Sequence, residues 1–198
     1  CIRDRSCDAI LQAWYPGQSG GLAVADVLFG DFNPSGKLPV TFYKNTDQLP
    51  DFEDYSMKNR TYRYMTEAPL FPFGYGLSYT TFDISKGRLN KKTISAGQDL
   101  NFKVNVKNTG KYDGAEVIQV YVRKVDDAEG PIKSLRAFRR VPLKAGETCV
   151  VSIDLLPTTF EFFDPTTNTM RIMPGKYEIM YGNSSDIPSG NKLSVTLR

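Results

Sequence analysis

Apolar and polar residues alternate along several stretches in the second half of the chain, over residues 100–106, 118–122, 149–155, 177–181 and 193–197. Successive side chains of a β-strand point to opposite faces, so a period of two predicts strands with one buried and one solvated face. The regular recurrence of these stretches limits the second half of the chain to an all-β architecture.

Turn signals separate the predicted strands, at Asn108-Thr109-Gly110, Ala145-Gly146-Glu147 and Pro174-Gly175-Lys176. About seven short strands without a convincing helix favour an immunoglobulin-like sandwich of the fibronectin type III-like kind over residues 80–198. The Cys-Trp-Cys pattern of true immunoglobulin domains is missing from this stretch.

The first 44 residues have a different pattern. An apolar run at 9–15 predicts a short strand, the apolar spacing over 22–29 predicts a helix, and 38–42 predicts a return strand. Ser19 is the predicted N-cap of the helix, and Gly30 is the predicted residue just after its end. One helix and two strands cannot enclose a core, so residues 1–44 are predicted to be the C-terminal remnant of an α/β domain.

Residues 45–79 are rich in aromatic side chains and contain Pro50, Pro69 and Pro72. This stretch is too long for an ordinary loop and too aromatic for a disordered linker, so we expect an inter-domain linker that is pinned by packing. Arg60 and Tyr62 are candidate substrate-binding residues, because planar cations and aromatic rings suit a saccharide subsite. The interpretation favoured here is that they staple two domains together.

Composition excludes several classes of chemistry. The 198 residues contain no histidine, which rules out within them a His-dependent triad, a histidine general base or an imidazole zinc site. The cysteines are Cys1, Cys7 and Cys149, without a C-x-x-C spacing that would suggest a metal or redox centre. A Cys1–Cys7 disulfide and free thiols are both compatible with this count. We expect no cofactor and no metal.

Charge argues against nucleic acid as a partner. The net charge is only +3, and Arg136, Arg139 and Arg140 are interleaved with other residues, which we interpret as a solvated strand face. No run of eighteen apolar residues is present, so no membrane span is predicted.

Several motifs, in this order, resemble the C-terminal region of glycoside hydrolase family 3. They are A-W-Y-P-G-Q-S-G-G at 13–21, A-D-V-L-F-G at 25–30, N-P-S-G-K-L-P-V-T at 33–41, R-T-Y-R-Y at 60–64, F-P-F-G-Y-G-L-S-Y-T at 71–80, and N-T-G, G-A-E-V and Q-V-Y-V at 108–110, 114–117 and 119–122. The resemblance covers essentially the whole chain, and R-T-Y-R-Y looks more like the β-xylosidases of the family than its β-glucosidases.

The resemblance implies a retaining, exo-acting β-glycosidase that releases β-linked xylose or glucose from the non-reducing end of oligosaccharides. Its barrel and α/β sandwich domains would pack against this chain and bind the oligosaccharide. The aspartate nucleophile and the glutamate acid/base of the family are expected upstream of Cys1. The chain alone is therefore predicted to hold no catalytic residue, to act as scaffold and possible subsite wall, and to be inactive. Periplasmic or extracellular residence is expected from the family.

Two clusters of carboxylates remain, at residues 51–54 and 126–129. Both are interpreted as solvated loop charge. A second hypothesis is that the sandwich is a carbohydrate-binding or protein-interaction module without catalysis.

Overall fold

Strands dominate the chain from residue 82 onward, and only short helices occur before it. The computed structural model describes residues 7–198. Cys1 lies outside the described residues, and so does the question of a Cys1–Cys7 disulfide. None of the helices in the described part is long and apolar enough to cross a membrane.

The N-terminal arm, defined as residues 7–79, contains α1 (Gly20–Phe29), η2 (Thr46–Gln48) and α2 (Thr61–Tyr64). The rest of the chain contains β1 (Phe82–Leu89), β2 (Thr93–Ile94), β3 (Leu100–Asn108), β4 (Gly114–Lys124), β5 (Ser134–Leu143), β6 (Thr148–Leu155), η3 (Pro157–Phe160), β7 (Glu161–Asp164), β8 (Thr169–Ile172), β9 (Gly175–Gly182) and β10 (Lys192–Leu197).

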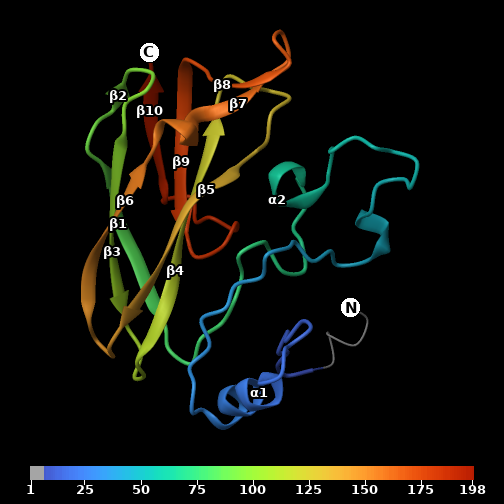
Figure 1. Ribbon diagram of the computed structural model, residues 1–198, viewed down its shortest axis with the longest axis vertical. Helices are drawn as coiled ribbons and strands as arrows, with labels where there is room; N and C mark the ends of the chain where they lie inside the picture. The colour runs from blue at the N-terminus through green and yellow to red at the C-terminus, as the bar shows by residue number, and fades with distance from the viewer. Residues whose placement is uncertain (1–6) are drawn as a thin grey trace.

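Two sheets face each other to make the sandwich (Figure 1). One sheet has the order β1-β3-β6 and the other β2-β10-β9-β4-β5, while β7 and β8 form a separate hairpin. All strand pairs are antiparallel except the short β2–β10 pair. The predicted class is confirmed, because a segment with the predicted helix precedes an all-β sandwich of two antiparallel sheets.

The alternation in the sequence places the core between the sheets. In β3 the burial alternates residue by residue, with Leu100, Phe102, Val104 and Val106 fully buried. They meet equally buried side chains of β4, β9 and β10 across the sandwich. Burial of each such side chain contributes about 1.5–3 kcal/mol, so the sandwich has a core of its own.

The arm departs from the sequence expectations at both predicted strands. Residues 9–15 form no strand, and 38–42 form only a single antiparallel bridge between Phe42 and Phe71. A strand needs a hydrogen-bonding neighbour, and none of the described residues supplies one for 9–15. Helix α1 forms because its hydrogen bonds are internal.

The ends of α1 agree only in part with the prediction. Gly30 follows the helix in the left-handed conformation, with φ of 85°, as its C-terminal position requires. Ser19 occupies the N-cap position, but its side chain makes no capping hydrogen bond.

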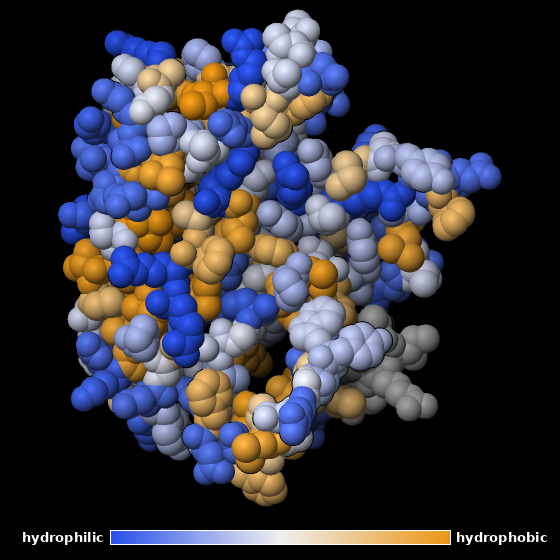
Figure 2. Space-filling model, in the orientation of Figure 1, coloured by the Kyte–Doolittle hydropathy of each residue, from blue (hydrophilic) through white to orange (hydrophobic). Residues whose placement is uncertain are grey.

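Helix α1 carries a largely uncovered apolar surface. Leu22 and Leu28 are exposed, and Phe29 is 84% exposed. In Figure 1 the helix lies apart from both sheets, and Figure 2 shows apolar side chains gathered at that end of the same face.

Candidate functional site

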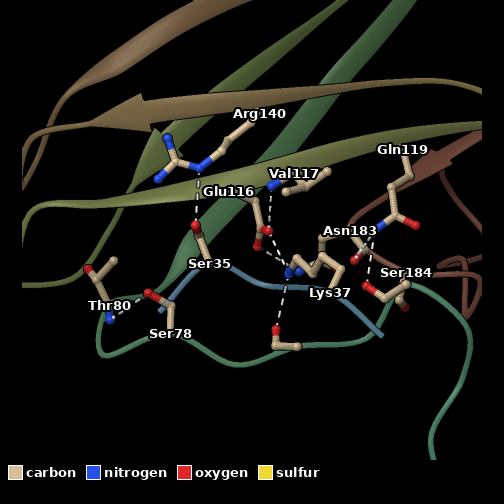
Figure 3. Close-up of polar contacts among 12 residues, drawn as sticks. Ser35, Lys37, Ser78, Thr80, Glu116, Val117, Gln119, Arg140, Asn183 and Ser184 are labelled. Atoms are coloured by element: carbon tan, nitrogen blue, oxygen red, sulfur yellow. Dashed lines mark hydrogen bonds and ion pairs between the residues drawn. The ribbon is translucent and has the colours of Figure 1, made fainter. Parts of the chain in front are cut away.

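The best-organised polar cluster joins the arm to the sandwich. Lys37 comes from the arm and Glu116 from β4, and Lys37 Nζ lies 2.6 Å from Glu116 Oε1 (Figure 3). Lys37 also donates a hydrogen bond to the Gly76 carbonyl at 3.0 Å. The two charged side chains are only 12% and 6% exposed. This contact is therefore a buried ion pair rather than a surface one.

Hydrogen bonds complete the environment of the Glu116 carboxylate. Its Oε1 accepts from the Val117 amide at 2.7 Å, and its Oε2 accepts from Asn183 Nδ2 at 2.9 Å. A buried charge is tolerated when it is both paired and hydrogen-bonded, and Glu116 meets both conditions.

Gln119, on the same strand, binds the arm backbone beside the ion pair. Its Nε2 donates to the Gly74 carbonyl at 3.0 Å and to the Asn183 carbonyl at 2.7 Å. Its Oε1 accepts from the Tyr121 hydroxyl at 2.5 Å. Burial, and after it the neighbouring Tyr62, raises the pKa of Tyr121, so this hydroxyl stays protonated and remains a donor.

Two glycines allow the arm to approach this closely. Gly74 has φ of 77°, and a Cβ there would lie 2.1 Å from Gln119 Oε1. A Cβ on Gly76 would lie 2.1 Å from the Gly36 carbonyl oxygen. Both positions therefore require glycine for close backbone approach, and Gly74 requires it for its conformation as well. We call Lys37, Gly74, Glu116, Gln119 and Asn183 the seam.

Asn33 ties a second part of the arm to the sandwich. Its Oδ1 accepts from the Ser78 hydroxyl and from the Tyr79 amide, both at 2.8 Å, and its Nδ2 donates to the Asp113 carbonyl at 2.9 Å. Asn33 and Lys37, both in the N-P-S-G-K-L-P-V-T motif, thus hold the two parts of the chain together.

Tyr62 is half-buried between the arm and the sandwich. Its ring stacks on Phe73 with centroids 4.2 Å apart and meets Tyr121 edge-on at 5.7 Å. Its hydroxyl accepts a hydrogen bond from the Leu135 amide at 3.1 Å. These contacts match a staple between the arm and the sandwich, while a role in substrate binding stays a prediction.

Arg60 organises its own loop. Its Nε donates to the Ser56 carbonyl at 2.9 Å, and its Nη2 donates to the Asp54 carbonyl. Arg60 therefore contacts its own loop, whereas Tyr62 contacts the sandwich. A role of Arg60 in substrate binding also stays a prediction.

The projecting loop, residues 45–60, presents two bare aromatic rings. Phe52 is 94% exposed and Tyr55 is 92% exposed. Asp51 and Asp54 accept the amides of Glu53 and Ser56 at 2.9 and 2.8 Å, which fixes the turns that carry these rings. A shallow hollow of about 330 Å³ lies beside them, and its lining includes Asp47, Asp51, Asp54, Lys58 and Glu67.

The carboxylate clusters at 51–54 and 126–129 do not form a metal centre. Within residues 7–198 no group of three or more Cys, Asp or Glu side chains is arranged to hold a metal ion. In the second cluster, Asp126 accepts the Lys176 amide at 3.2 Å, which is a structural contact.

Sequence reasoning missed the seam residues Lys37, Glu116, Gln119 and Asn183 as a group. A signal was present in β4, where Glu116 and Gln119 interrupt an otherwise apolar stretch, and both are almost completely buried. Arg136 was also misinterpreted as solvated: it is half-buried and lies over the Phe162 ring at 4.9 Å.

Lys37→Met should destabilise the chain by about 3–5 kcal/mol, because it leaves the Glu116 carboxylate buried without its cation. Urea unfolding measures this free energy, and the double variant Lys37→Met/Glu116→Met should recover a large part of the loss. Lys192→Met is the matched control, since Lys192 meets Glu178 at 3.9 Å in an exposed pair worth at most about 1 kcal/mol. Equal small losses for Lys37→Met and Lys192→Met would contradict the role of the seam.

Comparisons with known proteins identify the families that both parts of the chain resemble. Residues 2–79 match the glycosyl hydrolase family 3 C-terminal domain, and residues 116–185 match the fibronectin type III-like domain. A xylan 1,4-β-xylosidase of Xylanibacter ruminicola is 58% identical over 97% of this chain and 22% of the relative. A periplasmic β-glucosidase of Salmonella typhimurium is 40% identical over 92% of this chain and 25% of the relative.

Comparison with solved structures gives the same family. A β-glucosidase from Listeria innocua, solved with glucose, superposes with a TM-score of 0.81 at 33% identity over 98% of this chain and 28% of that one. The chain thus spans about a quarter of the length of the relatives it matches. It belongs to glycoside hydrolase family 3, and it carries that family's C-terminal domain joined to a fibronectin type III-like domain.

Proposed function

We propose that the chain is the C-terminal portion of a retaining, exo-acting β-glycosidase that removes non-reducing-end β-linked xylose, or glucose as the next choice. The observation that carries this proposal is the 58% identity to a xylan 1,4-β-xylosidase over nearly the whole chain. The R-T-Y-R-Y sequence at 60–64 supports xylose, while the 40% identical relative is named a β-glucosidase.

In this proposal both catalytic carboxylates lie outside the chain. Retaining hydrolysis uses two carboxyl groups about 5 Å apart, one as nucleophile and one as acid/base. The carboxylates of Asp51 and Asp54 instead accept backbone amides of their own loop. The amide of Ser56 is the main cause that lowers the pKa of Asp54, which is the opposite of what a catalytic acid needs.

The chain would then work as a scaffold in three parts. We propose a remnant of the α/β sandwich domain at 1–44, an inter-domain linker at 45–79 and the fibronectin type III-like sandwich at 80–198. The exposed apolar side chains of α1 suit a contact with the rest of the α/β sandwich domain. Periplasmic or extracellular residence accompanies this proposal, supported by the relative named as periplasmic.

The projecting loop would form a wall of a saccharide subsite. Phe52 and Tyr55 are almost bare on a loop that hydrogen bonds hold in shape, so their rings are available for stacking. Aromatic rings pack well against the C–H faces of sugars because both surfaces are flat and apolar. Arg60 fixes the base of this loop and would contribute indirectly.

The purified 198-residue chain should not hydrolyse 4-nitrophenyl β-D-xyloside or β-D-glucoside. The full-length protein should hydrolyse at least one of them, and proton NMR of the reaction should detect the β-anomer of the sugar first, as retention requires. Turnover by the chain alone, or an α-anomer as first product, would overturn the assignment of roles.

In the full-length protein, Phe52→Ala and Tyr55→Ala should each raise KM for a disaccharide substrate by about two- to tenfold, the range expected for one lost stacking contact. The exposed ring of Phe163 on β7 provides the control variant Phe163→Ala, which should leave KM unchanged. Steady-state kinetics measures both. An unchanged KM in both loop variants would remove the loop from the subsite.

A further inference from the structure

Two arginines without an acidic partner lie together where α2 packs on β5. The Arg63 carbonyl accepts the Ile132 amide at 2.7 Å, and the Tyr62 hydroxyl accepts the Leu135 amide at 3.1 Å. These bonds hold the backbone of Arg63 against the segment that leads into β5, the strand that carries Arg136. Burial lowers the pKa of Arg136, and the nearby charge of Arg63 lowers it further.

A β-bulge sets the position of Arg136. Tyr121 on β4 faces Leu135, and the preceding Val120 faces Ala137, so Arg136 is the extra residue of the pair. Bulges commonly re-aim a side chain away from the regular pattern of the sheet. The Arg136 guanidinium lies over the Phe162 ring and donates from Nη2 to the Glu161 carbonyl, which fixes its plane.

Both guanidinium groups are incompletely satisfied. Arg63 Nε and Arg136 Nε are buried and have no hydrogen-bond acceptor, and neither arginine forms an ion pair within residues 7–198. The hydroxyl of Ser134, a residue 5% exposed and two positions before Arg136, is also buried without a partner. The Glu161 carboxylate favours the charged form of Arg136 but does not pair with it.

Two positive charges in such surroundings favour an anion. Guanidinium groups match carboxylates through parallel N–H donors, and the match is stronger where water is partly excluded. With both Nε groups buried, the Nη groups are the donors left for a ligand. The rings of Tyr64, 5.6 Å from the Arg63 guanidinium carbon, and of Phe162 add apolar surface.

We propose that Arg63 and Arg136 form a binding site for the carboxylate of an acidic sugar. This inference rests on the proposed function for its saccharide, and it does not depend on hydrolysis. Uronic acids are the carboxylate-bearing sugars nearest in structure to xylose and glucose. The site distinguishes a charged sugar from a neutral one of the same shape.

The test is a titration of the 198-residue chain followed through the Nε–H signals of arginine in ¹H–¹⁵N spectra at constant ionic strength. D-glucuronate should shift the signals of Arg63 and Arg136 saturably, D-glucose should shift neither, and acetate should bind at least fivefold more weakly than glucuronate. Since no turnover is measured, failure of the glycosidase proposal would leave this result unaffected.

Variants assign the site. Arg63→Gln and Arg136→Gln should each weaken glucuronate binding at least tenfold, whereas Arg139→Gln should not, because Arg139 is exposed on the same strand and donates to the Ser152 carbonyl. If Arg136→Gln disturbs the fold, Arg63→Gln alone decides, with the dispersion of the methyl signals reporting on folding.

Three outcomes would overturn the proposal. Shifts that do not saturate would mean that no site exists. Acetate binding as tightly as glucuronate would assign the site to an acidic side chain of the rest of the protein rather than to a sugar. Tighter binding of inorganic phosphate than of glucuronate would show that the site prefers another anion to a carboxylate.

Discussion

The buried ion pair between Lys37 and Glu116 is the contact on which the arrangement of this chain depends. The arm has no core of its own, since α1 exposes its apolar face and the predicted flanking strands are not formed. Its position therefore comes from the sandwich. A charge pair with little exposure is directional as well as attractive, because a displaced partner would leave the other charge buried and unpaired.

The neighbouring contacts extend this constraint from one point to a surface. Gln119 fixes the Gly74 carbonyl, Tyr62 stacks between Phe73 and the sandwich, and the Ser185 amide donates to the Phe73 carbonyl at 2.8 Å. The base of the projecting loop is thereby held at a defined place relative to β4 and β5. Under the proposed function this rigidity would matter for catalysis, since misplacement of a substrate-contacting group by about 1 Å lowers a reaction rate strongly.

The sequence allowed the sandwich to be predicted well and the arm only in part. The period-two pattern marks β3, β6, β9 and β10 because one face of each meets the core. The sequence did not predict β1, because a bulge between Ser85 and Arg88 interrupts the alternation of its apolar and polar residues. The strand predicted at 9–15 finds no partner strand among the described residues, and no local pattern encodes whether a partner is present.

The candidate site was harder to predict, and for a different reason. Lys37 and Glu116 are 79 positions apart, so their pairing follows from the tertiary fold rather than from spacing. The nearby motifs were visible in the sequence, but the close contacts of Gly74 with Gln119 and of Gly76 with Gly36 were not. Arg136 was misjudged because the bulge turns its side chain out of the expected alternation.

Native-state amide hydrogen exchange tests most directly whether the seam joins the arm and the sandwich. Three amides report on it: Leu38 donates to the Tyr75 carbonyl, Gly74 to the Leu38 carbonyl and Ser185 to the Phe73 carbonyl. If the seam makes the arm and the sandwich one cooperative unit, these amides should exchange within about tenfold of the core amide of Val104. Exchange of the three amides at the rate of an open loop, while Val104 stays protected, would contradict it.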